Sequence, residues 1–331
     1  MRTGDHTMSI VIPVYQGEQS LPSLIEAIEP LTRGFATPDG RAARVVEVVL
    51  VHDCGPDGSD RLMRRLAAEK DWVHAVWLSR NFGQHAATLA GMSYSGGDWV
   101  ATLDEDGQYD PGDLGTMLDT AMREQADVVY ASPLNAPPHG PLRNFASRAA
   151  KRSLRFATAQ PHATAFNSYR LILGDVARSV AAYAGPGIYL DVALGWVARS
   201  VATSPVTLTA ETRPSNYSLR SLLSHYWRMV LTGGTRPLRA VSAAGLVFAI
   251  LGFLFALVIV GIRIYGDIPV AGWASVMIVT LLGAGVTLTA LGIITEYVGV
   301  AVNMALGKPL FLMVSDRAEG PLGREDASQD P

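Results

Sequence analysis

Two long stretches without a charged side chain limit what this chain can fold into. Ala240–Ile262 and Val270–Thr295 are each longer than the roughly 20 apolar residues that a helix needs to cross a membrane. The link between them, Arg263–Pro269, is short, so the two helices would form a hairpin. Only 17% of the whole chain is charged, against about 25% in a typical soluble protein. The sequence therefore predicts a soluble part followed by a two-helix membrane part.

Basic residues flank this hairpin on its outer sides. Arg228, Arg236 and Arg239 precede the first apolar stretch, and Lys308 and Arg317 follow the second. Because positively charged flanks favour the cytoplasmic side of a membrane, both outer ends are predicted to be cytoplasmic. The chain is thus expected to be a multi-pass protein of the inner or plasma membrane, with its soluble domain and both termini in the cytoplasm.

The N-terminus and the composition agree with a cytosolic soluble part. Met1–Ser9 has no basic region followed by a long apolar one, so no signal peptide is predicted. The single cysteine, Cys54, excludes an intrachain disulfide and fits a reducing compartment. A formal net charge of −3 argues against a nucleic-acid partner, which would require a strongly basic face.

Short apolar runs alternate with amphipathic segments in the first part of the chain. Strands are predicted at five of these runs: Ser9–Val14, Val45–Val51, Val73–Leu78, Trp99–Leu103 and Asp127–Ala131. Helices are predicted between them at Ser20–Leu31, with Ser20 as its N-cap, and at Asp60–Ala68 and Gln84–Met92. This alternation is typical of βαβ units and a mainly parallel sheet, and therefore of an α/β fold.

Polar residues gather where the predicted strands end. The four clusters are Tyr15–Glu18, His52–Ser59, Ser79–His85 and Asp104–Gln108. In open α/β sheets, ligands bind beyond the carboxyl ends of the strands. The sequence therefore predicts a binding site at this edge of the sheet.

The Asp104-Glu105-Asp106 segment is the strongest chemical signal in these clusters. Two carboxylates one residue apart at a strand end can hold a hard divalent cation, and this cation can bridge a diphosphate. Gln108 could add a neutral oxygen ligand. Asp110 is interpreted as the cap of the following helix.

The remaining segments complete the predicted organisation. Residues 142–156 form a basic amphipathic segment, which is typical either of a membrane-interface helix or of an ordinary solvated helix. A polar tail after Ser315 is expected to be disordered. We predict a globular domain over 1–215 that includes the interfacial helix near 142–156, a juxtamembrane amphipathic helix over 216–239, the hairpin over 240–311 with spans at about 240–262 and 270–295, and a disordered cytosolic tail over 312–331.

Four motifs occur in the order and at the spacing of a known family. They are SIVIPVYQGEQSL from Ser9, VHDCGPDGSD from Val51, RNFGQHAATLAGMSYSGGDW from Arg80 and LDEDGQYDP from Leu103. Together they resemble glycosyltransferase family 2, whose members have the GT-A fold. With the hairpin, the chain is similar to the polyprenyl-phosphate glycosyltransferases, which include dolichol-phosphate mannose synthases, bactoprenol glucosyltransferases and the undecaprenyl-phosphate aminoarabinose transferase. The resemblance extends from Ser9 to about Phe311.

This resemblance implies transfer of a sugar from a nucleotide sugar, with a UDP-sugar favoured, to a polyprenyl phosphate such as undecaprenyl or decaprenyl phosphate. The product would supply cell-envelope glycan assembly or modification. The resemblance further implies Mg²⁺ or Mn²⁺ as cofactor, a lipid bilayer as partner, and possible homo-oligomers formed through the membrane helices.

The resemblance also assigns roles to residues of the donor side. Pro13, Tyr15 and Glu18 would line the nucleotide pocket, Asp53 would reach the base, and Arg80 and Gln84 would flank the donor. Asp104 and Asp106 would be the metal and diphosphate carboxylates, with Gln108 as a further metal ligand. Arg170 in NSYRL and Arg213 in RPSNYS would belong to the same donor-binding set.

On the acceptor side, Arg143 and Arg148 resemble the basic residues that receive the lipid phosphate, and with Asp104 and Asp106 they form the implied catalytic set. A lipid phosphate is largely ionised near pH 7, because its second pKa is about 6, so it needs no general base. Arginine forks can place it for attack. The metal stabilises the charge of the leaving diphosphate, and a single displacement inverts the anomeric centre, as in the family.

The chain departs from the family pattern at several positions. Gln16-Gly17 stands where members usually carry Asn-Glu, and His52-Asp53 stands where they carry a paired Asp. No arginine follows the fifth strand in SPLNAPP, and Thr164 replaces a common Asp. His52 could be a wall of the base pocket or a catalytic base. His85 could be a core residue or a ligand contact.

Two other functions share parts of this pattern. A processive polysaccharide synthase has the same core, but it would normally carry a Gln-x-x-Arg-Trp segment, where this chain reads GIYLDVALGW at Gly187–Trp196, and more spanning helices. A membrane scaffold with a decayed transferase core would account for the departures at Gln16-Gly17 and His52. The intact set of Asp104, Asp106 and Gln108 counts against the scaffold.

Overall fold

The computed structural model describes residues 4–134, 165–185, 188–208, 236–265, 272–307, 309–316 and 318. The predicted amphipathic segment at 142–156 lies outside these residues, and so do residues 216–235 of the predicted juxtamembrane helix over 216–239 and three predicted site residues, Arg143, Arg148 and Arg213.

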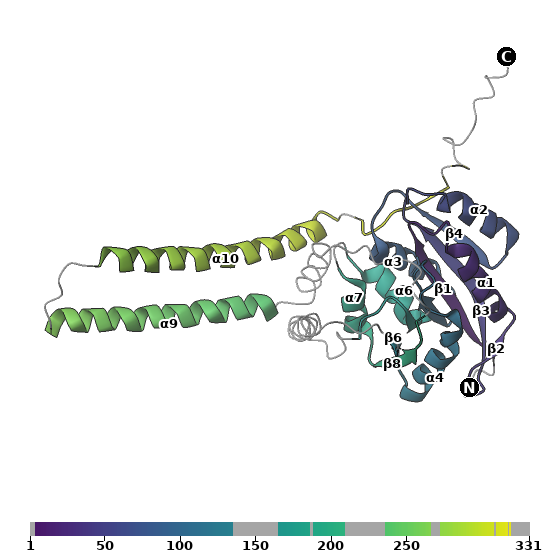
Figure 1. Ribbon diagram of the computed structural model, residues 1–331, viewed down its shortest axis with the longest axis horizontal. Coiled ribbons are helices and arrows are strands. Elements are labelled where there is room, and N and C mark those ends of the chain that lie inside the picture. Colours follow the sequence, from purple (N-terminus) through teal and green to yellow (C-terminus); the bar gives the residue numbers. More distant parts are fainter. Residues whose placement is uncertain are drawn as a thin grey trace, which may run out of the picture.

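The strands form one twisted sheet with helices on both faces (Figure 1). The strands are β1 (His6–Val14), β2 (Phe35–Ala36), β3 (Ala42–His52), β4 (Val73–Leu78), β5 (Trp99–Thr102), β6 (Val128–Pro133), β7 (Arg170–Leu173), β8 (Val201–Val206) and β9 (Met313–Val314). The helices are α1 (Leu21–Thr32), α2 (Ser59–Glu69), α3 (Gln84–Tyr94), the short η1 (Pro111–Asp113), α4 (Leu114–Glu124), α6 (Gly174–Tyr183), α7 (Leu190–Val197), α9 (Arg236–Tyr265) and α10 (Trp273–Ala305).

The strand order is β8-β6-β7-β5-β1-β3-β4-β9, with β2 paired to β3. β1 is parallel to both β3 and β5, β3 is parallel to β4, and β6 is parallel to β8. β7 runs antiparallel between β5 and β6. The five predicted strands and the mainly parallel sheet are confirmed, while the antiparallel β7 was not predicted.

The central strand β1 shows why these runs become interior strands. Met8 to Val14 are buried without interruption, as in a strand covered on both faces. Ile10 and Ile12 face the core that α1, α2 and α4 cover, whereas Val11 faces the core under α3, α6 and α7. This alternation follows from the period of two along a strand, and it anchors the helices whose loops build the site.

Two helix starts were predicted from capping residues. Asp110 accepts a hydrogen bond from Gly112 N at 2.8 Å, so its role as a cap is confirmed. Ser20 does not cap α1, and its buried hydroxyl has no hydrogen-bond partner among the described residues. Instead, Gly17 O accepts from both Ser20 N and Leu21 N, because the turn that precedes α1 is already helical.

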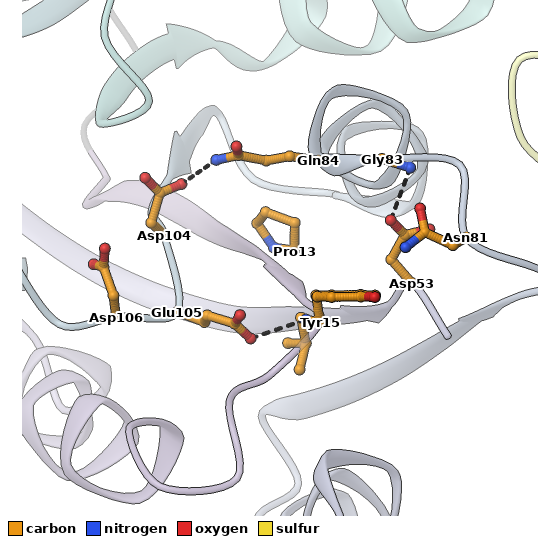
Figure 2. A pocket seen from close by; sticks show the side chains of 10 residues that line it. Pro13, Tyr15, Asp53, Asn81, Gly83, Gln84, Asp104, Glu105 and Asp106 are labelled. Carbon is orange, nitrogen blue, oxygen red and sulfur yellow. Dashed lines mark hydrogen bonds between the residues drawn. The ribbon is translucent and has the colours of Figure 1, made fainter. Parts of the chain in front are cut away.

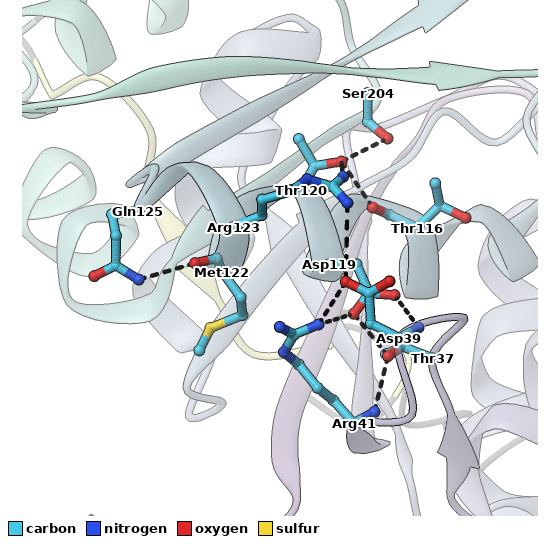
Figure 3. Close-up of polar contacts among 10 residues, drawn as sticks. All are labelled: Thr37, Asp39, Arg41, Thr116, Asp119, Thr120, Met122, Arg123, Gln125 and Ser204. Carbon is cyan, nitrogen blue, oxygen red and sulfur yellow. Dashed lines mark hydrogen bonds and ion pairs between the residues drawn. The ribbon is translucent and has the colours of Figure 1, made fainter.

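A polar network on α4 holds the loop between β2 and β3 (Figure 3). The buried Asp119 accepts hydrogen bonds from Thr37 Oγ1 at 2.7 Å, Asp39 N at 2.7 Å and Arg41 Nη1 at 2.6 Å. The loop precedes β3, so it lies at the edge of the sheet opposite the carboxyl ends of the parallel strands. Asp119 therefore stabilises the fold by holding this loop.

The long helices α9 and α10 lie side by side and extend away from the sheet domain (Figure 1). They span 30 and 33 residues, and both contain windows apolar enough to cross a membrane, Arg236–Phe255 and Leu282–Ala305. Most of their described apolar side chains are exposed, with Phe253 at 65% and Leu288 at 68%. Exposed apolar faces on this scale are typical of contact with lipid.

The segment after α10 returns to the sheet domain. β9 pairs antiparallel with the edge strand β4, and Ser79 N donates to Leu312 O at 2.9 Å. The buried Asp316 forms an ion pair with Arg64 of α2. The prediction of disorder from residue 312 is therefore wrong for 312–316, because the open edge of β4 and the Arg64 guanidinium supply partners that the tail's polar composition does not reveal.

Candidate active site

A pocket of about 370 Å³ opens at the carboxyl edge of the central strands (Figure 2). Its size is within the range of small-ligand sites, roughly 300–1,000 Å³. The described residues that line it are Pro13, Val14, Tyr15, Asp53, Asn81, Gly83, Gln84, Asp104, Glu105 and Asp106. They come from the polar clusters predicted after β1, β3, β4 and β5.

The sheet brings these clusters together. β3 and β5 flank β1 in parallel, so their carboxyl ends reach the same edge. Asp53 N donates to Val14 O at 2.8 Å, and Leu103 N donates to Val11 O at 3.0 Å, so the ladders continue up to the site. α3 begins beside the pocket and carries Gln84 at its first turn.

Asp104 is held from two sides. Gln84 Nε2 donates to its Oδ1 at 2.5 Å, and Ser168 Oγ donates to its Oδ2 at 2.6 Å. Burial raises the pKa of the Asp104 carboxyl, and Asp106 adds to the increase, whereas the bonds from Ser168 and Gln84 and the charge of Arg170 oppose it. A bound cation would favour the charged form that burial disfavours.

Asp106 is more open than Asp104. It is exposed, and its Oδ1 accepts from Gln108 N at 3.1 Å. Gly107 between them has a φ of +70°, a left-handed conformation that favours glycine and turns the chain back at this point. In the part of the chain that the structure describes, no three acidic, histidine or cysteine side chains form a preformed metal centre. The protein here offers two carboxylates, and a cation would need ligands from elsewhere.

Comparison with known proteins identifies the chain. The model of the family described as "Glycosyl transferase family 2" matches residues 9–182. The chain belongs to glycosyl transferase family 2. This membership confirms the predictions of an enzyme, of a glycosyltransferase and of its GT-A fold.

Relatives of this family 2 glycosyltransferase are similar over nearly its full length. The undecaprenyl-phosphate 4-deoxy-4-formamido-L-arabinose transferase of Pseudomonas paraeruginosa is 32% identical and covers 92% of this chain and 89% of its own. The enzyme of the same name from Erwinia tasmaniensis is 30% identical and covers 92% and 93%. Among solved structures, glucosyl-3-phosphoglycerate synthase from Mycobacterium tuberculosis is 16% identical, with a TM-score of 0.49 over 70% of this chain and 78% of that one.

Asp53 lines the pocket of the glycosyltransferase, and its hydrogen bonds are to the protein. Its predicted contact with the nucleotide base stays a prediction. Its Oδ1 accepts from Phe82 N at 2.7 Å and its Oδ2 from Gly83 N at 2.8 Å. Burial raises the pKa of the Asp53 carboxyl, while these two bonds and Arg80 lower it. Asp53 thus fixes the loop before α3.

Two other predicted donor residues do not line the pocket. Glu18 Oε2 accepts from Gly58 N at 3.0 Å and joins the loop after β1 to the loop before α2. The exposed Arg80 lies over the Phe82 ring, with its guanidinium carbon 4.2 Å from the ring centre. Both flank the site without facing the cavity in this structure.

Arg170 is not among the described residues that line the pocket. Its side chain is buried, Nη2 is 3.1 Å from Asp191 Oδ1, and Nε donates to Asn167 O at 2.9 Å. Tyr130 OH donates to the same Asp191 carboxylate at 3.0 Å. In this structure Arg170 forms an ion pair in the core, and its predicted contact with the donor stays a prediction.

His52 and His85 both pack against aromatic rings. His52 is buried 5.3 Å from the Trp77 ring, outside the pocket lining, and burial lowers the pKa of its imidazole. His85 packs against Tyr189 of the segment before α7, with ring centres 4.0 Å apart and the ring planes tilted by 55°. Neither histidine belongs to the described lining of the pocket. The roles of His52 as a base-pocket wall or as a base, and a ligand contact by His85, stay predictions.

Sequence reasoning missed four residues of the lining, Val14, Asn81, Gly83 and Glu105, of which Asn81 and Glu105 have polar side chains. Asn81 was quoted only as part of a motif, and Glu105 only as the residue between two metal carboxylates. Glu105 Oε2 accepts from Tyr15 N and Oε1 from Gln16 N, both at 2.9 Å. A third acidic residue in the same loop was the available signal, although its partners lie about 90 residues earlier in the chain.

Proposed function

We propose that this glycosyltransferase moves a sugar from a nucleotide sugar, with a UDP-sugar favoured, to undecaprenyl or decaprenyl phosphate. The product would be a lipid-linked sugar for cell-envelope glycan assembly or modification. The observation that carries the proposal is a carboxylate-lined pocket in a chain that also has two membrane-capable helices. Relatives named as undecaprenyl-phosphate sugar transferases, similar over 92% of the chain, support the lipid acceptor.

The charge of the pocket supports the metal. Its described lining includes four carboxylates, from Asp53, Asp104, Glu105 and Asp106, and no lysine or arginine. A nucleoside diphosphate is anionic, so it would be repelled unless a cation intervened. Mg²⁺ and Mn²⁺ suit oxygen ligands, and Mg²⁺ commonly takes one or two carboxylates with waters and substrate phosphates. Asp104 and Asp106, with Gln108, would hold it, and it would stabilise charge on the leaving diphosphate.

The acceptor explains why the mechanism needs no protein base. A lipid phosphate is already ionised near pH 7, so the protein must only position it and neutralise its charge. Arg143 and Arg148 are proposed for this task, because a guanidinium fork binds two phosphate oxygens at once. A direct displacement of the diphosphate by the phosphate oxygen would invert the anomeric centre.

A transfer assay with the full chain in detergent tests this function. We expect label from one of a set of radiolabelled UDP-sugars and other nucleotide sugars to enter the organic phase only when undecaprenyl phosphate is present. One sugar per lipid is the expected product, whereas a processive synthase would give growing chains. A wild-type protein that binds nucleotide and metal but produces no labelled lipid would support the scaffold instead.

We also propose that α9 and α10 cross the inner or plasma membrane with the catalytic domain and both termini in the cytoplasm. The same proposal keeps the predicted domain limits, which are 1–215, 216–239 and 240–311. It also includes homo-oligomers that form through these helices. It is supported by the length of the two helices, their exposed apolar side chains and the basic flanks.

Labelling of single cysteines checks this topology. In a Cys54→Ser background, Asp267→Cys in the short link is expected to react with an impermeant thiol reagent added to intact cells. Ser315→Cys, in the exposed segment beside β9, is expected to react only after the cells are permeabilised. The reverse pattern would place the pocket outside the cytoplasm and contradict the proposal.

A further inference from the structure

Glu105 faces a different way from the two carboxylates that flank it. Its side chain points back toward the loop after β1, where it meets Tyr15 (Figure 2). Its two oxygens accept one hydrogen bond each, from Tyr15 N and Gln16 N, both at 2.9 Å. A carboxylate bound by two backbone N–H groups is a strong, charge-assisted contact. Glu105 therefore joins the loop after β1 to the loop that carries Asp104 and Asp106.

Gly17 makes room for this contact. A Cβ atom at Gly17 would lie 2.7 Å from Glu105 Oε2 and 2.9 Å from Leu21 Cγ, closer than real Cβ atoms approach other atoms. Any larger residue at position 17 would push the Glu105 carboxylate away from the two N–H groups. The glycine and the glutamate therefore depend on each other, although 88 positions separate them (105 − 17).

The other side of the same loop is held independently. Gly17 N donates to Ser59 Oγ at 2.9 Å, and Ser59 Oγ donates to Asp57 Oδ1 at 2.7 Å. Asp57 Oδ2 accepts from Glu18 N at 3.2 Å. The loop is thus fixed at Gly17 and Glu18 by the segment before α2, whereas Tyr15 and Gln16 are fixed by Glu105.

We infer that Glu105 is a positioning residue that couples the two walls of the pocket. One wall is Tyr15, which is 42% exposed and lines the cavity, and the other is the carboxylate pair of Asp104 and Asp106. Because Glu105 lies between the pair in sequence and binds the opposite wall, the two walls move together. This inference rests on the proposed function, in which a nucleotide and a cation occupy the same pocket.

Binding measurements on the full chain in detergent test the coupling. Glu105→Gln keeps the shape of the side chain but turns one acceptor into a donor that faces an N–H group. We expect the Kd for UDP in the presence of Mn²⁺ to rise about ten- to a hundredfold, the value of a charge-assisted hydrogen bond. The Kd for Mn²⁺ alone, measured by electron paramagnetic resonance, should remain within about twofold of wild type.

Glu47→Gln is the matched control. Glu47 Oε1 likewise accepts two short bonds, from Ser9 Oγ and Gly96 N at 2.6 Å each, but at the opposite end of the sheet. A purely structural effect would lower Tm in both variants and leave both UDP affinities unchanged. That result would overturn the inference, and so would a large loss of Mn²⁺ affinity in Glu105→Gln, which would make Glu105 a metal ligand.

A double-mutant cycle gives a second, independent reading. Gly17→Ala should weaken UDP binding in the wild-type background because it displaces the Glu105 carboxylate. In the Glu105→Ala background the same change should cost at least about threefold less, since the displaced group is absent. Additive effects would contradict the coupling. A wild-type chain that binds no UDP would instead refute the nucleotide assignment and the inference with it, whereas UDP binding and transfer unaffected by Glu105→Gln would refute the inference alone.

Discussion

Replacing Asp106 with Asn is expected to lower the rate of sugar transfer by about a hundred- to a thousandfold, which corresponds to roughly 3–4 kcal/mol of lost transition-state stabilisation. Asp106 is the exposed carboxylate of the pair, and its replacement removes a charged ligand of the proposed cation. The described lining of the pocket has no positive side chain that could hold the diphosphate in place of that cation. Asn keeps the size of the side chain, so the protein should remain folded and in the membrane. Transfer to undecaprenyl phosphate by purified protein measures the loss.

Asp110→Asn provides the control for this prediction. Asp110 lies four positions later, but its side chain caps η1 by accepting from Gly112 N, and Asn caps helices about as well as Asp does. This variant should keep nearly full activity. EDTA should abolish transfer by the wild type, and added Mg²⁺ or Mn²⁺ should restore it. Full activity in EDTA, or equal losses in both variants, would refute the metal assignment.

Removing the guanidinium of Arg170 is expected to have the largest effect on stability. Arg170→Ala leaves Asp191 buried without its ion-pair partner, and both side chains are less than 5% exposed. Breaking such a buried pair costs about 3–5 kcal/mol, so Tm in detergent should fall by roughly 6–20 °C. The exposed Arg33, which pairs with Glu29 at 3.5 Å, is the control, and Arg33→Ala should change Tm by less than about 2 °C.

A paired replacement separates packing from catalysis at this position. Arg170→Met combined with Asp191→Leu removes both charges and should recover much of the lost stability, because apolar residues of similar size often replace a buried ion pair without net cost. If the double variant is stable and its Kd for UDP is normal, Arg170 acts through the fold. A stable double variant that no longer binds UDP would return Arg170 to the donor-binding set.

Much of the fold was predictable because its determinants are local. The continuous apolar run of β1 and the alternation of strand and helix predicted the parallel core, and the charge-free stretches predicted α9 and α10. The antiparallel β7 and the short β9 were not predicted. Both depend on partners elsewhere in the sheet, β5 and β6 for one and the open edge of β4 for the other.

The candidate site divides in the same way. The sequence by itself determined that Asp104 and Asp106 follow a central strand, and that Pro13, Tyr15, Asp53 and Gln84 lie at the same edge, because parallel strands bring their carboxyl ends together. Only the tertiary structure decided what the side chains bind. It directs Arg170 to Asp191 in the core and Glu105 to the N–H groups of Tyr15 and Gln16. The physical reason is that a motif specifies a position along the chain, whereas a buried charge takes whichever partner the packing of distant segments brings within hydrogen-bond distance.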